Sequence, residues 1–434
     1  MNLLIKNGRL VDPGTRTDRV CDILVEKGLI KEISSSIDIS DISAGIETID
    51  AAGLVVCPGF IDIHVHLREP GQEHKEDIES GSRAAVRGGF TSIVCMPNTS
   101  PVNDGIEVTA HILRRAGEVG LVNIFPVAAV SRNLESRELT DMDALVKQGV
   151  KGFSDDGRCV MSEELFKEAL RKAKVLGVPI IEHPEDHSLS RDGQINEGVV
   201  SAACGLKGIP AASEDVIIDR DIRLQEEVGS FLHLTHISTA GAVRSIGEAK
   251  ARGIAVTADV TPHHLLLEET MILRDGTCDS NYKMKPPLRT EADRQVLIEG
   301  LKTGIIDCIA TDHAPHSREE KTRDFEKTPF GIIGMETAFS IIYDRLVRTG
   351  IIGLERLVEV FSCNPARILN LAGRGVVQVG LAADLTILNL ARAFKIKAED
   401  FRSKSVNCPF IGWEGYGVVE YTVVGGRVVY RGNS

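Results

Sequence analysis

The chain has 434 residues, of which 43% are hydrophobic, so it can bury a sizeable core and is neither disordered nor collagen-like. Its formal net charge of −12 argues against nucleic acid or an anionic membrane as the main partner. No apolar run approaches the ~18 residues of a membrane span, and the first residues lack a signal-peptide core, so we expect a cytoplasmic protein.

Two glycine-containing dipeptides mark turns at the two ends of the chain. Asn7-Gly8 near the start and Gly425-Gly426 near the end each stand between apolar stretches. Such dipeptides favour the positive φ that a tight hairpin turn needs. We therefore expect a β-hairpin at each end of the chain.

Further strand-like segments accompany these hairpins. Residues 22–34 and 382–390 are rich in β-branched side chains. Two arrangements fit this pattern, namely two unrelated hairpins or one small domain assembled from both ends. We expect the second arrangement, a β-sandwich domain of residues 1–55 and 371–434 that flanks a central domain of residues 56–370.

The central part alternates short apolar runs with helical patterns. Apolar residues at helical spacing predict helices over residues 76–89, 162–177 and 240–253. The runs that we expect to be strands are 54–66, 90–98, 123–130, 150–156, 178–183, 231–238, 254–264 and 306–316. Eight strands alternating with helices is the count of a closed (β/α)8 barrel of the TIM type, whereas an open doubly wound sheet has no reason to stop at eight. We therefore expect an α/β fold built on such a barrel.

Polar side chains gather where these runs end, which is where barrels of this kind carry their chemistry. The residues at these ends are His64, His66, Asn98, Asp155, Asp156, His183, His236, Asp312, His313 and His316. The parallel strands of a barrel end on one side, so the sequence predicts that these side chains converge there.

His64 and His66 are the first indication of a metal site. Side chains two residues apart on a strand share a face, so both imidazoles can point toward one ion. The alternative is a pair of hydrogen-bonded histidines, but candidate ligands at other strand ends favour a metal. Imidazole and carboxylate ligands without thiolate suit Zn²⁺, with Mn²⁺ or Co²⁺ as alternatives.

A carboxylate at the fourth run can join two such ions. Two divalent cations close together repel each other, so an anionic ligand between them is useful. We expect Asp156 to be this bridge. The alternatives are that Asp155 bridges instead, or that Asp155-Asp156-Gly157 is a simple turn.

Other residues have simpler interpretations. His233 has the opposite parity to His236 and should face the helices as a hydrogen-bonded core residue. His263 and His264 follow Pro262, which predicts a rigid turn, with a place behind the metal ligands as the alternative. Surface or structural positions are expected for His74, His111 and His187. The nine cysteines show no paired spacing, which is typical of reduced thiols, and core packing is expected for Cys57, Cys95 and Cys308.

Residues 316–334 form a charged segment followed by a glycine-containing apolar stretch. Two interpretations remain for this segment. It is either a solvated loop or a mobile lid above the site that contacts the substrate.

With these motifs in place, the chain resembles the dihydroorotases of the longer bacterial type, within the amidohydrolase superfamily. The resemblance covers nearly the whole chain, and HLREPG followed at a distance by ATDHAPH is its most specific pair. The stretches that carry it are HVHLREPG (64–71), MPNT (96–99), GFSDDG (152–157), IIEHPED (180–186), LTHIS (234–238), DVTPHHLLL (259–267), PPLR (286–289), IATDHAPH (309–316), PFGIIGMET (329–337) and NPARIL (364–369).

The resemblance implies a (β/α)8 barrel with a small β-domain and two zinc ions per subunit. It implies that His64, His66 and Asp312 hold one zinc ion. The second ion would be held by His183 and His236, with Asp156 as the bridge. The implied substrate contacts are His66, Arg68, Asn98 and His316, together with Phe330 and Gly331 from the loop.

The implied reaction is the reversible cyclisation of N-carbamoyl-L-aspartate to (S)-dihydroorotate in de novo pyrimidine (UMP) biosynthesis. Zinc lowers the pKa of a bound water toward ~7. Asp312 would be the catalytic residue that accepts a proton from the attacking water and passes it to the leaving nitrogen. Arg68 would supply a bidentate cationic anchor for the substrate carboxylate, which an acidic protein needs.

One position departs from the family pattern. The family often reads K-M-N-P-P-L-R, in which the asparagine contacts the substrate, but this chain has Lys285 there. We do not transfer that contact, and Lys285 either supplies a cation to the substrate or points elsewhere. We further expect a homo-oligomer acting on a small molecule, able to associate with aspartate carbamoyltransferase.

Two other functions compete with this interpretation. The first is another cyclic amide hydrolase, such as a hydantoinase, dihydropyrimidinase or allantoinase. Those relatives mostly use a carboxylated lysine as the bridge and lack the equivalent of Arg68, whereas here the nearby Lys151 lies roughly 16 Å from Asp156 along a strand. The second is a catalytically silent scaffold for aspartate carbamoyltransferase, which would have lost metal ligands that this chain retains.

Overall fold

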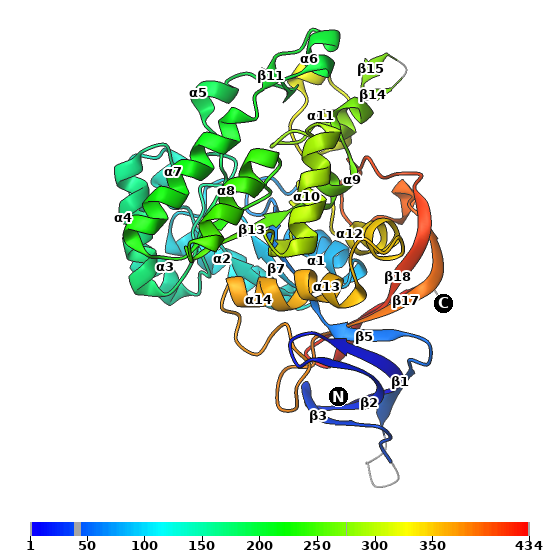
Figure 1. The fold of residues 1–434 in the computed structure, drawn as a ribbon. Helices are drawn as coiled ribbons and strands as arrows, with labels where there is room; N and C mark the ends of the chain where they lie inside the picture. The colour runs from blue at the N-terminus through cyan, green and yellow to red at the C-terminus, as the bar shows by residue number, and fades with distance from the viewer. Residues whose placement is uncertain (1, 39–44, 275, 433–434) are drawn as a thin grey trace.

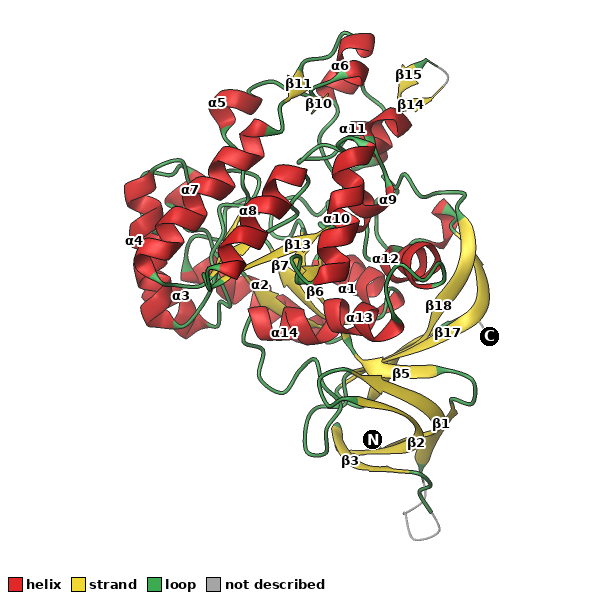
Figure 2. Cartoon of the chain, viewed as in Figure 1, coloured by secondary structure: helices red, strands yellow, loops and turns green. Residues whose placement is uncertain are grey.

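Short apolar runs in the middle of the chain form parallel strands that close into a barrel (Figures 1 and 2). The computed structural model describes residues 2–38, 45–274 and 276–432. The barrel strands are β6 (Phe60–Val65), β7 (Phe90–Cys95), β8 (Asn123–Pro126), β9 (Ile180–Glu182), β12 (Leu232–Leu234), β13 (Val256–Val260) and β16 (Cys308–Ile309). They pair as β6-β7-β8 and as β9-β12-β13-β16.

Three single-residue bridges, at two junctions, close these groups into one barrel. Phe153, in the fourth predicted run, forms parallel bridges to Ala128 and to Ile180. Val65 forms a parallel bridge to His313 at the other junction. The expected (β/α)8 barrel is therefore confirmed, with the fourth strand reduced to one bridged residue.

Helices cover the outside of the barrel because their apolar residues repeat at helical spacing. In α4 (Glu163–Leu176), Phe166, Ala169, Leu170 and Ala173 are buried on one face. Ser162 caps its start by accepting a hydrogen bond from Leu165 N. The other outer helices are α1 (Ile78–Arg87), α2 (Ile106–Val119), α3 (Met142–Gln148), α7 (Ala212–Val228), α8 (Ala240–Ala251), α10 (Glu291–Thr303), α12 (Ala338–Ile342), α13 (Leu354–Val358) and α14 (Asn364–Ile368).

Shorter elements lie where the barrel strands end, at the side opposite the terminal sheet in Figure 1. They are α5 (His187–Ser190), β10 (Ile195–Asn196), α6 (Val199–Cys204), β11 (Gly208–Ile209), α9 (Pro262–Leu266), β14 (Leu273–Arg274), β15 (Thr277–Cys278) and α11 (Arg318–Lys321). Single turns complete the chain at η1 (Arg132–Leu134), η2 (Glu269–Ile272), η3 (Ser280–Tyr282), η4 (Phe325–Lys327), η5 (Tyr343–Val347), η6 (Glu359–Cys363) and η7 (Ala398–Asp400). We call the end of the barrel at which its strands end the rim.

Both ends of the chain meet in one sheet of order β19-β18-β17-β5-β1-β2-β3, with β4 beside β1. Its strands are β1 (Asn2–Asp12), β2 (Thr17–Glu26), β3 (Leu29–Ser34), β4 (Ile46–Asp50), β5 (Val55–Pro58), β17 (Leu385–Lys395), β18 (Glu414–Val424) and β19 (Arg427–Arg431). Side chains from the two ends, such as Leu3, Ile23 and Leu385, share one buried apolar cluster. This is the small β-domain beside the barrel.

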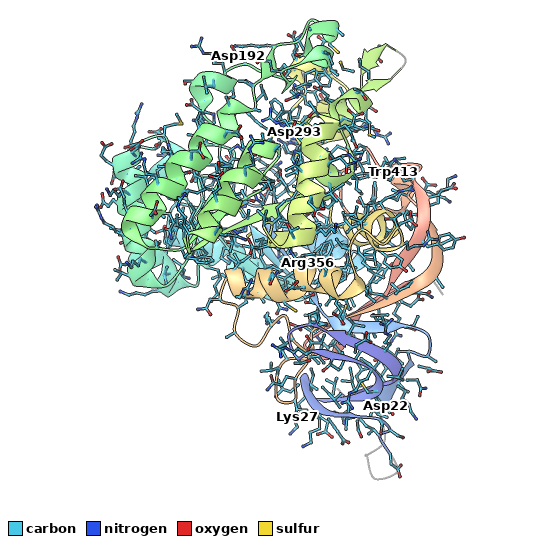
Figure 3. The ribbon with its side chains drawn as sticks, in the orientation of Figure 1. Asp22, Lys27, Asp192, Asp293, Arg356 and Trp413 are labelled. Atoms are coloured by element: carbon cyan, nitrogen blue, oxygen red, sulfur yellow. The ribbon has the colours of Figure 1, made fainter. Side chains whose placement is uncertain are left out.

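The two predicted hairpin turns had different outcomes. Gly425-Gly426 joins β18 to β19 with positive φ at both residues, so this prediction is confirmed. The prediction for Asn7-Gly8 is wrong, because this pair lies inside β1 at a bulge where the register to β2 shifts. Asn7 adopts a φ of 61°, and its N–H donates to the carboxylate of Asp22, which is labelled in Figure 3. A bulge uses the same positive φ as a hairpin turn, which is why the dipeptide was misread.

Apolar side chains fill the inside of the barrel beneath the rim. Ile61 and Ile63 from β6, Val94 from β7 and Ile181 from β9 form one buried cluster with Val127, which follows β8, and with residues of α14. The barrel is therefore a packed core rather than a channel, and the predicted site residues lie above this apolar layer. No helix within the described ranges has the length and apolarity to cross a membrane.

Candidate metal centre and substrate pocket

Five strand ends bring six of the predicted residues together at the rim. These residues are His64, His66, Asp156, His183, His236 and Asp312, and all of them are buried. Asp312 Oδ1 lies 3.0 Å from His66 Nε2 and 3.5 Å from His64 Nε2. His64 and His66 thus share one face, as their spacing predicted.

Asp156 occupies the middle of this group. Its Oδ1 lies 3.3 Å from His64 Nε2, 3.4 Å from His183 Nδ1 and 3.5 Å from His236 Nε2. Asp155 points elsewhere, since its carboxylate accepts hydrogen bonds from the backbone N–H and hydroxyl of Ser131. Of the two adjacent aspartates, only Asp156 therefore faces the histidines.

The nitrogen and oxygen atoms of these side chains are arranged to bind cations rather than to form hydrogen bonds with one another. His64, Asp156 and His236 each offer one ligand atom within 4.8 Å of the others, and so do His64, His66 and Asp312. His183 lies outside both groups, but its Nδ1 is 2.9 Å from His236 Nε2. Within the described structure, His64 Nε2 and Asp156 Oδ1 are buried without any hydrogen-bond partner. Buried polar atoms normally have partners, so a metal ion fits this arrangement.

Hydrogen bonds from behind set the orientation of the three histidines that have such partners. His64 Nδ1 donates to Thr235 Oγ1 at 2.7 Å, and Thr235 in turn donates to Asp259. The outer nitrogens of the other two also have acceptors, which are Asn98 Oδ1 for His66 and Glu185 Oε2 for His183. Each bond leaves the other ring nitrogen free to bind a cation.

Three of these acceptors were not predicted from the sequence. Thr235 immediately precedes a candidate ligand, Glu185 follows one by two residues, and Asp259 stands on the neighbouring strand. Proximity to a predicted ligand is the signal that could have indicated the first two. Asp259 could be found only from the pairing of β12 with β13.

The electrostatics of the cluster favour charged imidazoles when no cation is present. Burial lowers the pKa of His64, but Asp156 and Asp312 outweigh burial and raise that pKa to about 9. His183 shows the same balance, and Asp156 together with Glu185 raises its pKa to about 10. Burial acts to raise the pKa of Asp156, yet the surrounding histidines hold it well below its usual range. The carboxylates therefore stay ionised and attract positive charge.

Three residues at the site also have a strained backbone. Arg68, His236 and Asp312 have φ values of 61°, 39° and 45°. Non-glycine residues in this region each carry a strain of order 1–3 kcal/mol and occur preferentially at functional sites. The fold holds these three side chains in their places against that strain.

A cavity of about 360 Å³ opens above the cluster. It is lined by the predicted site residues His66, Arg68, Asn98, Asp156, His183, His236, Asp312, His316 and Phe330. Arg68 donates from Nε to Pro315 O at 3.2 Å, and its Nη2 lies 3.3 Å from His316 Nε2. Among the described residues no carboxylate forms an ion pair with Arg68, although burial lowers the pKa of this guanidinium to about 10. A buried, unpaired guanidinium is suited to an anionic ligand.

The segment 316–334 is folded over this cavity. Lys283 and Lys321, both buried, hold it by donating to backbone carbonyls, Lys283 to Phe325 O at 2.7 Å and Lys321 to Gly331 O at 3.1 Å. The ammonium of Lys283 also lies 4.7 Å from the Phe330 ring centroid. Of the two interpretations of this segment, the geometry favours a loop that contacts the site.

Gly331 sits where the loop approaches the barrel most closely. A Cβ at this position would lie 2.5 Å from Ala314 O and 2.6 Å from His316 Cδ2. Its N–H donates to Lys283 O, and its carbonyl accepts from Asn407 Nδ2. Only a glycine fits here, and its backbone polar groups already have partners in the protein.

Lys285 lines the cavity, and its ammonium lies 2.7 Å from Glu185 Oε1. It does not point into solvent, because only 23% of its side chain is exposed. In the structure Lys285 therefore lines the cavity and contacts a neighbouring carboxylate, Glu185.

The remaining histidines lie around the cluster or away from it. His233 is buried and donates to Asp259 Oδ2 at 2.8 Å, as expected of a hydrogen-bonded core residue. His263 and His264 belong to the short helix α9, so the predicted turn is wrong. Pro262 at the first helical position and the Thr261 cap favour that helix. His111 contacts Glu69 and His187 accepts from Cys159 N, whereas His74 is exposed.

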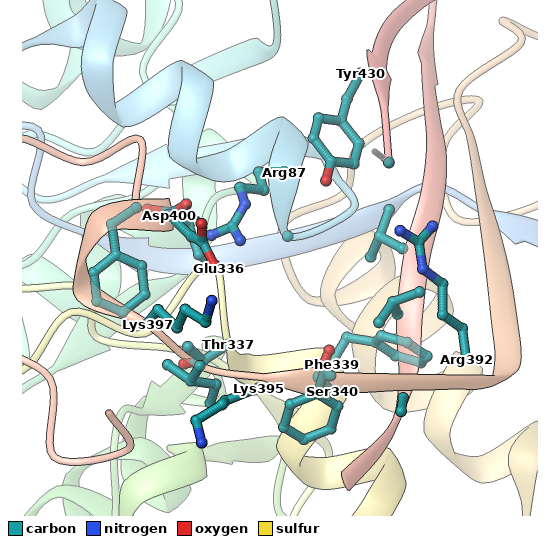
Figure 4. A pocket seen from close by; sticks show the side chains of 18 residues that line it. Arg87, Glu336, Thr337, Phe339, Ser340, Arg392, Lys395, Lys397, Asp400 and Tyr430 are labelled. Carbon is teal, nitrogen blue, oxygen red and sulfur yellow. Dashed lines mark hydrogen bonds and ion pairs between the residues drawn. The ribbon is translucent and has the colours of Figure 1, made fainter. Parts of the chain in front are cut away.

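A second cavity, of about 200 Å³, lies between the barrel and the long β17–β18 pair (Figure 4). Figure 4 shows Arg87 and Glu336 side by side, and they form an ion pair at 2.7 Å. Lys395 is paired in the same way with Glu414. No predicted site residue lines this second cavity, whereas nine of them line the cavity above the histidines.

Sequence comparison finds relatives over the full length. The family described as Dihydro-orotase-like matches residues 53–242, and the family described as Amidohydrolase family matches residues 348–430. A protein named Dihydroorotase from Geobacter metallireducens is 47% identical over 431 residues, covering 99% of this chain and 100% of that protein. Another of the same name, from Staphylococcus epidermidis, is 47% identical and covers 99% of both chains.

Solved structures match the fold equally completely. An L-hydantoinase (dihydropyrimidinase) from Arthrobacter aurescens has a TM-score of 0.87 at 29% identity, covering 99% of this chain and 96% of that one. A dihydropyrimidinase from Brevibacillus agri has a TM-score of 0.84 at 25% identity, with 99% and 95% covered. The barrel and the terminal sheet are thus both shared with these proteins.

Proposed function

The chain belongs to the dihydroorotase family and catalyses the reversible cyclisation of N-carbamoyl-L-aspartate to (S)-dihydroorotate in pyrimidine synthesis, and we propose that it does so at a centre of two zinc ions. His64, His66 and Asp312 would hold one ion, and His183 and His236 the other, with Asp156 between them. The imidazole and carboxylate donor set and the unpartnered buried atoms support this assignment. When bound, zinc supplies a Lewis acid that lowers the pKa of water toward ~7.

The side chains of this chain have separate tasks in the reaction. Asp312 holds the proton of the attacking water on its carboxylate and delivers it to the ring nitrogen that leaves when dihydroorotate opens. Its low pKa, which the histidines hold below the usual range despite burial, keeps it ready to accept that proton. The reverse transfer accompanies cyclisation.

The substrate carboxylate is bound on the other side of the cavity. Arg68 supplies the charge, while Asn98 and His316 supply hydrogen-bonding groups beside it. Phe330 covers the ring, and Gly331 lets the loop come close enough for this contact. His66 faces both the ion and the substrate.

The observation that carries the substrate class is Arg68 itself. A buried guanidinium without a carboxylate partner in the described structure, facing a cavity beside a metal centre, matches a cyclic amide that carries a carboxylate. Hydantoin and dihydrouracil, which the structural neighbours' names point to, have no such group.

The test is a paired assay of the zinc-loaded protein. We expect interconversion of carbamoyl-aspartate and dihydroorotate, and loss of turnover after chelation. The assignment would be overturned if the protein turned over hydantoin or dihydrouracil but neither carbamoyl-aspartate nor dihydroorotate.

We also propose a cytoplasmic homo-oligomer able to bind aspartate carbamoyltransferase, and a domain division at residues 55/56 and 370/371. Sedimentation of the protein with and without that partner tests the assembly.

A further inference from the structure

One carboxylate links an unusual lysine to a candidate metal ligand. Glu185 is buried, and its two oxygens face different partners. Oε1 lies 2.7 Å from the ammonium of Lys285, and Oε2 lies 3.1 Å from His183 Nε2. The three residues therefore form a continuous chain from the wall of the cavity to the metal centre.

The position of the His183 proton depends on this contact. A neutral imidazole carries one N–H, and its other nitrogen offers a lone pair. Glu185 accepts the N–H at Nε2, so the lone pair is left on Nδ1, which faces Asp156 and His236 at 3.4 and 2.9 Å. A carboxylate behind a histidine ligand fixes both the tautomer and the ring orientation.

Lys285 restrains the same carboxylate from the other side. The side chain of Glu185 is 6% exposed, and a charged or ionisable group lies against each of its two oxygens. The other nearby cation candidate, His187 Nδ1, is farther away at 3.7 Å and partly exposed. The ammonium of Lys285 therefore lies 1 Å nearer to the Glu185 carboxylate than the His187 ring does, on the oxygen opposite to His183.

We propose that Lys285 is a positioning residue that acts through Glu185 to hold the His183 lone pair on the metal, rather than a substrate contact. This inference rests on the proposed two-metal function. It gives this chain a use for residue 285 that differs from the asparagine contact of related sequences.

The experiment measures metal affinity as well as turnover. Zinc alone is the probe, in competition with a chromophoric chelator, for the full-length protein and its K285M, K285R and E185A variants. We expect K285M and E185A to weaken one of the two zinc equivalents by about 10–100-fold and to lower kcat at limiting zinc. KM for carbamoyl-aspartate should change less than about threefold, K285R should restore zinc affinity, and excess zinc should restore kcat.

A double variant decides how Lys285 acts. If it works through Glu185, K285M adds nothing to zinc loss in the E185A background, since the two effects share one path. If K285M raises KM while zinc affinity stays unchanged, Lys285 contacts the substrate and the proposal is wrong. An unchanged zinc affinity and unchanged KM would overturn it as well.

A matched control separates this effect on zinc binding from the general effect of losing a buried ion pair. Lys250 lies 2.6 Å from Asp307 with 24% of its side chain exposed, close to the values for Lys285, and no candidate ligand touches that pair. K250M should keep both zinc equivalents. Wild-type protein that binds no zinc, or turns over neither substrate, would instead count against the proposed function.

A second, independent observation concerns two cysteines at the rim. Cys204 ends α6 and Cys278 lies in β15, and their sulfur atoms are 3.0 Å apart although 74 residues separate them. The same two segments are joined again nearby, where Lys283 donates to Gln194 Oε1. Lys283 also holds the loop over the cavity, so a covalent link here would tie the rim together.

We infer that Cys204 and Cys278 form a reversible disulfide. The two thiols lose two protons and two electrons to glutathione disulfide, which is reduced to two molecules of glutathione. Incubation of the zinc-loaded protein in a glutathione redox buffer, followed by non-reducing peptide mass spectrometry, should give one Cys204–Cys278 cross-link that reductant removes.

The control is C363S, which alters another partly buried cysteine and should leave the cross-link in place. C278S should abolish it. Glutathione adducts on both cysteines without a cross-link, or cross-links that form equally between other cysteines, would refute the inference.

Discussion

Replacing Arg68 with methionine should make the ligand-free protein more stable and the enzyme much worse. Burial lowers the pKa of Arg68 from 12.5 to about 10, which at ~1.4 kcal/mol per unit corresponds to a penalty of about 3 kcal/mol for the buried charge. The substitution also removes the hydrogen bond from Nε to Pro315 O, and this loss lowers the free energy of unfolding by ~1 kcal/mol. The net expectation is a gain of ~2 kcal/mol in the free energy of unfolding.

The assay combines thermal unfolding with steady-state kinetics. An unfolding entropy of ~2.1 cal/mol/K per residue amounts to roughly 0.9 kcal/mol/K for 434 residues, so Tm should rise by about 2 °C. Removing one partner of a buried, hydrogen-bonded charge pair costs ~2–5 kcal/mol, so kcat/KM should fall by roughly 30- to 5,000-fold.

Arg289 provides the control with the opposite sign. It is equally buried, but it donates to Asn196 Oδ1 and Ile209 O and lies 3.6 Å from Glu214. Burial lowers the pKa of Arg289 as well, but R289M should still lower the free energy of unfolding by ~3–5 kcal/mol, because Glu214 is left without its charge partner. The reasoning fails if R68M is less stable than the wild type, or if it keeps kcat/KM within threefold.

Four further predictions follow from the site. G331A should raise KM at least tenfold with little change in Tm, because its Cβ would lie 2.5 Å from Ala314 O and displace the loop; unchanged KM would contradict this. Burial lowers the pKa of Lys321 to about 7 from 10.5, so the unfolded loop binds more protons between these values and loop stability should rise from pH 7 to 10.5. Cleavage of the loop by trypsin, normalised to a free peptide, should therefore slow as pH rises, and K321M should remove that trend. D312N should keep zinc at least partly bound yet abolish turnover, measured by metal analysis beside the assay; near-normal rates would refute its proton-transfer role. Chelation should lower both activity and Tm, and zinc should restore both, since a ligand that binds only the folded state stabilises it.

The barrel could be predicted from the sequence because its strands are buried on both sides and appear as separate apolar runs. In the fourth run the structure keeps a single bridged residue, Phe153, instead of a strand. Asn7-Gly8 was misread because local sequence does not distinguish a bulge from a hairpin turn when both need positive φ.

The candidate ligands could be predicted as residues at strand ends, whereas the groups behind them could not. His64 donates to Thr235, which is 171 residues away, and Thr235 donates to Asp259 on another strand. Such contacts depend on which strands become neighbours, and no local pattern encodes that. The pairing of Lys285 with Glu185, 100 positions apart in the printed sequence, was hidden for the same reason.

The terminal sheet imposes an order on how this protein can be made. β5 is complete at Pro58, but its antiparallel partner β17 begins only at Leu385. At ~5–20 residues per second, a ribosome needs roughly 15–65 s to reach β17 after releasing β5. During that time the edge of β5 that β17 will cover has no native partner, so β1–β5 emerge as an unfinished sheet while the barrel is being synthesised. β17 can therefore pair with β5 only after the whole sequence of the barrel has been synthesised.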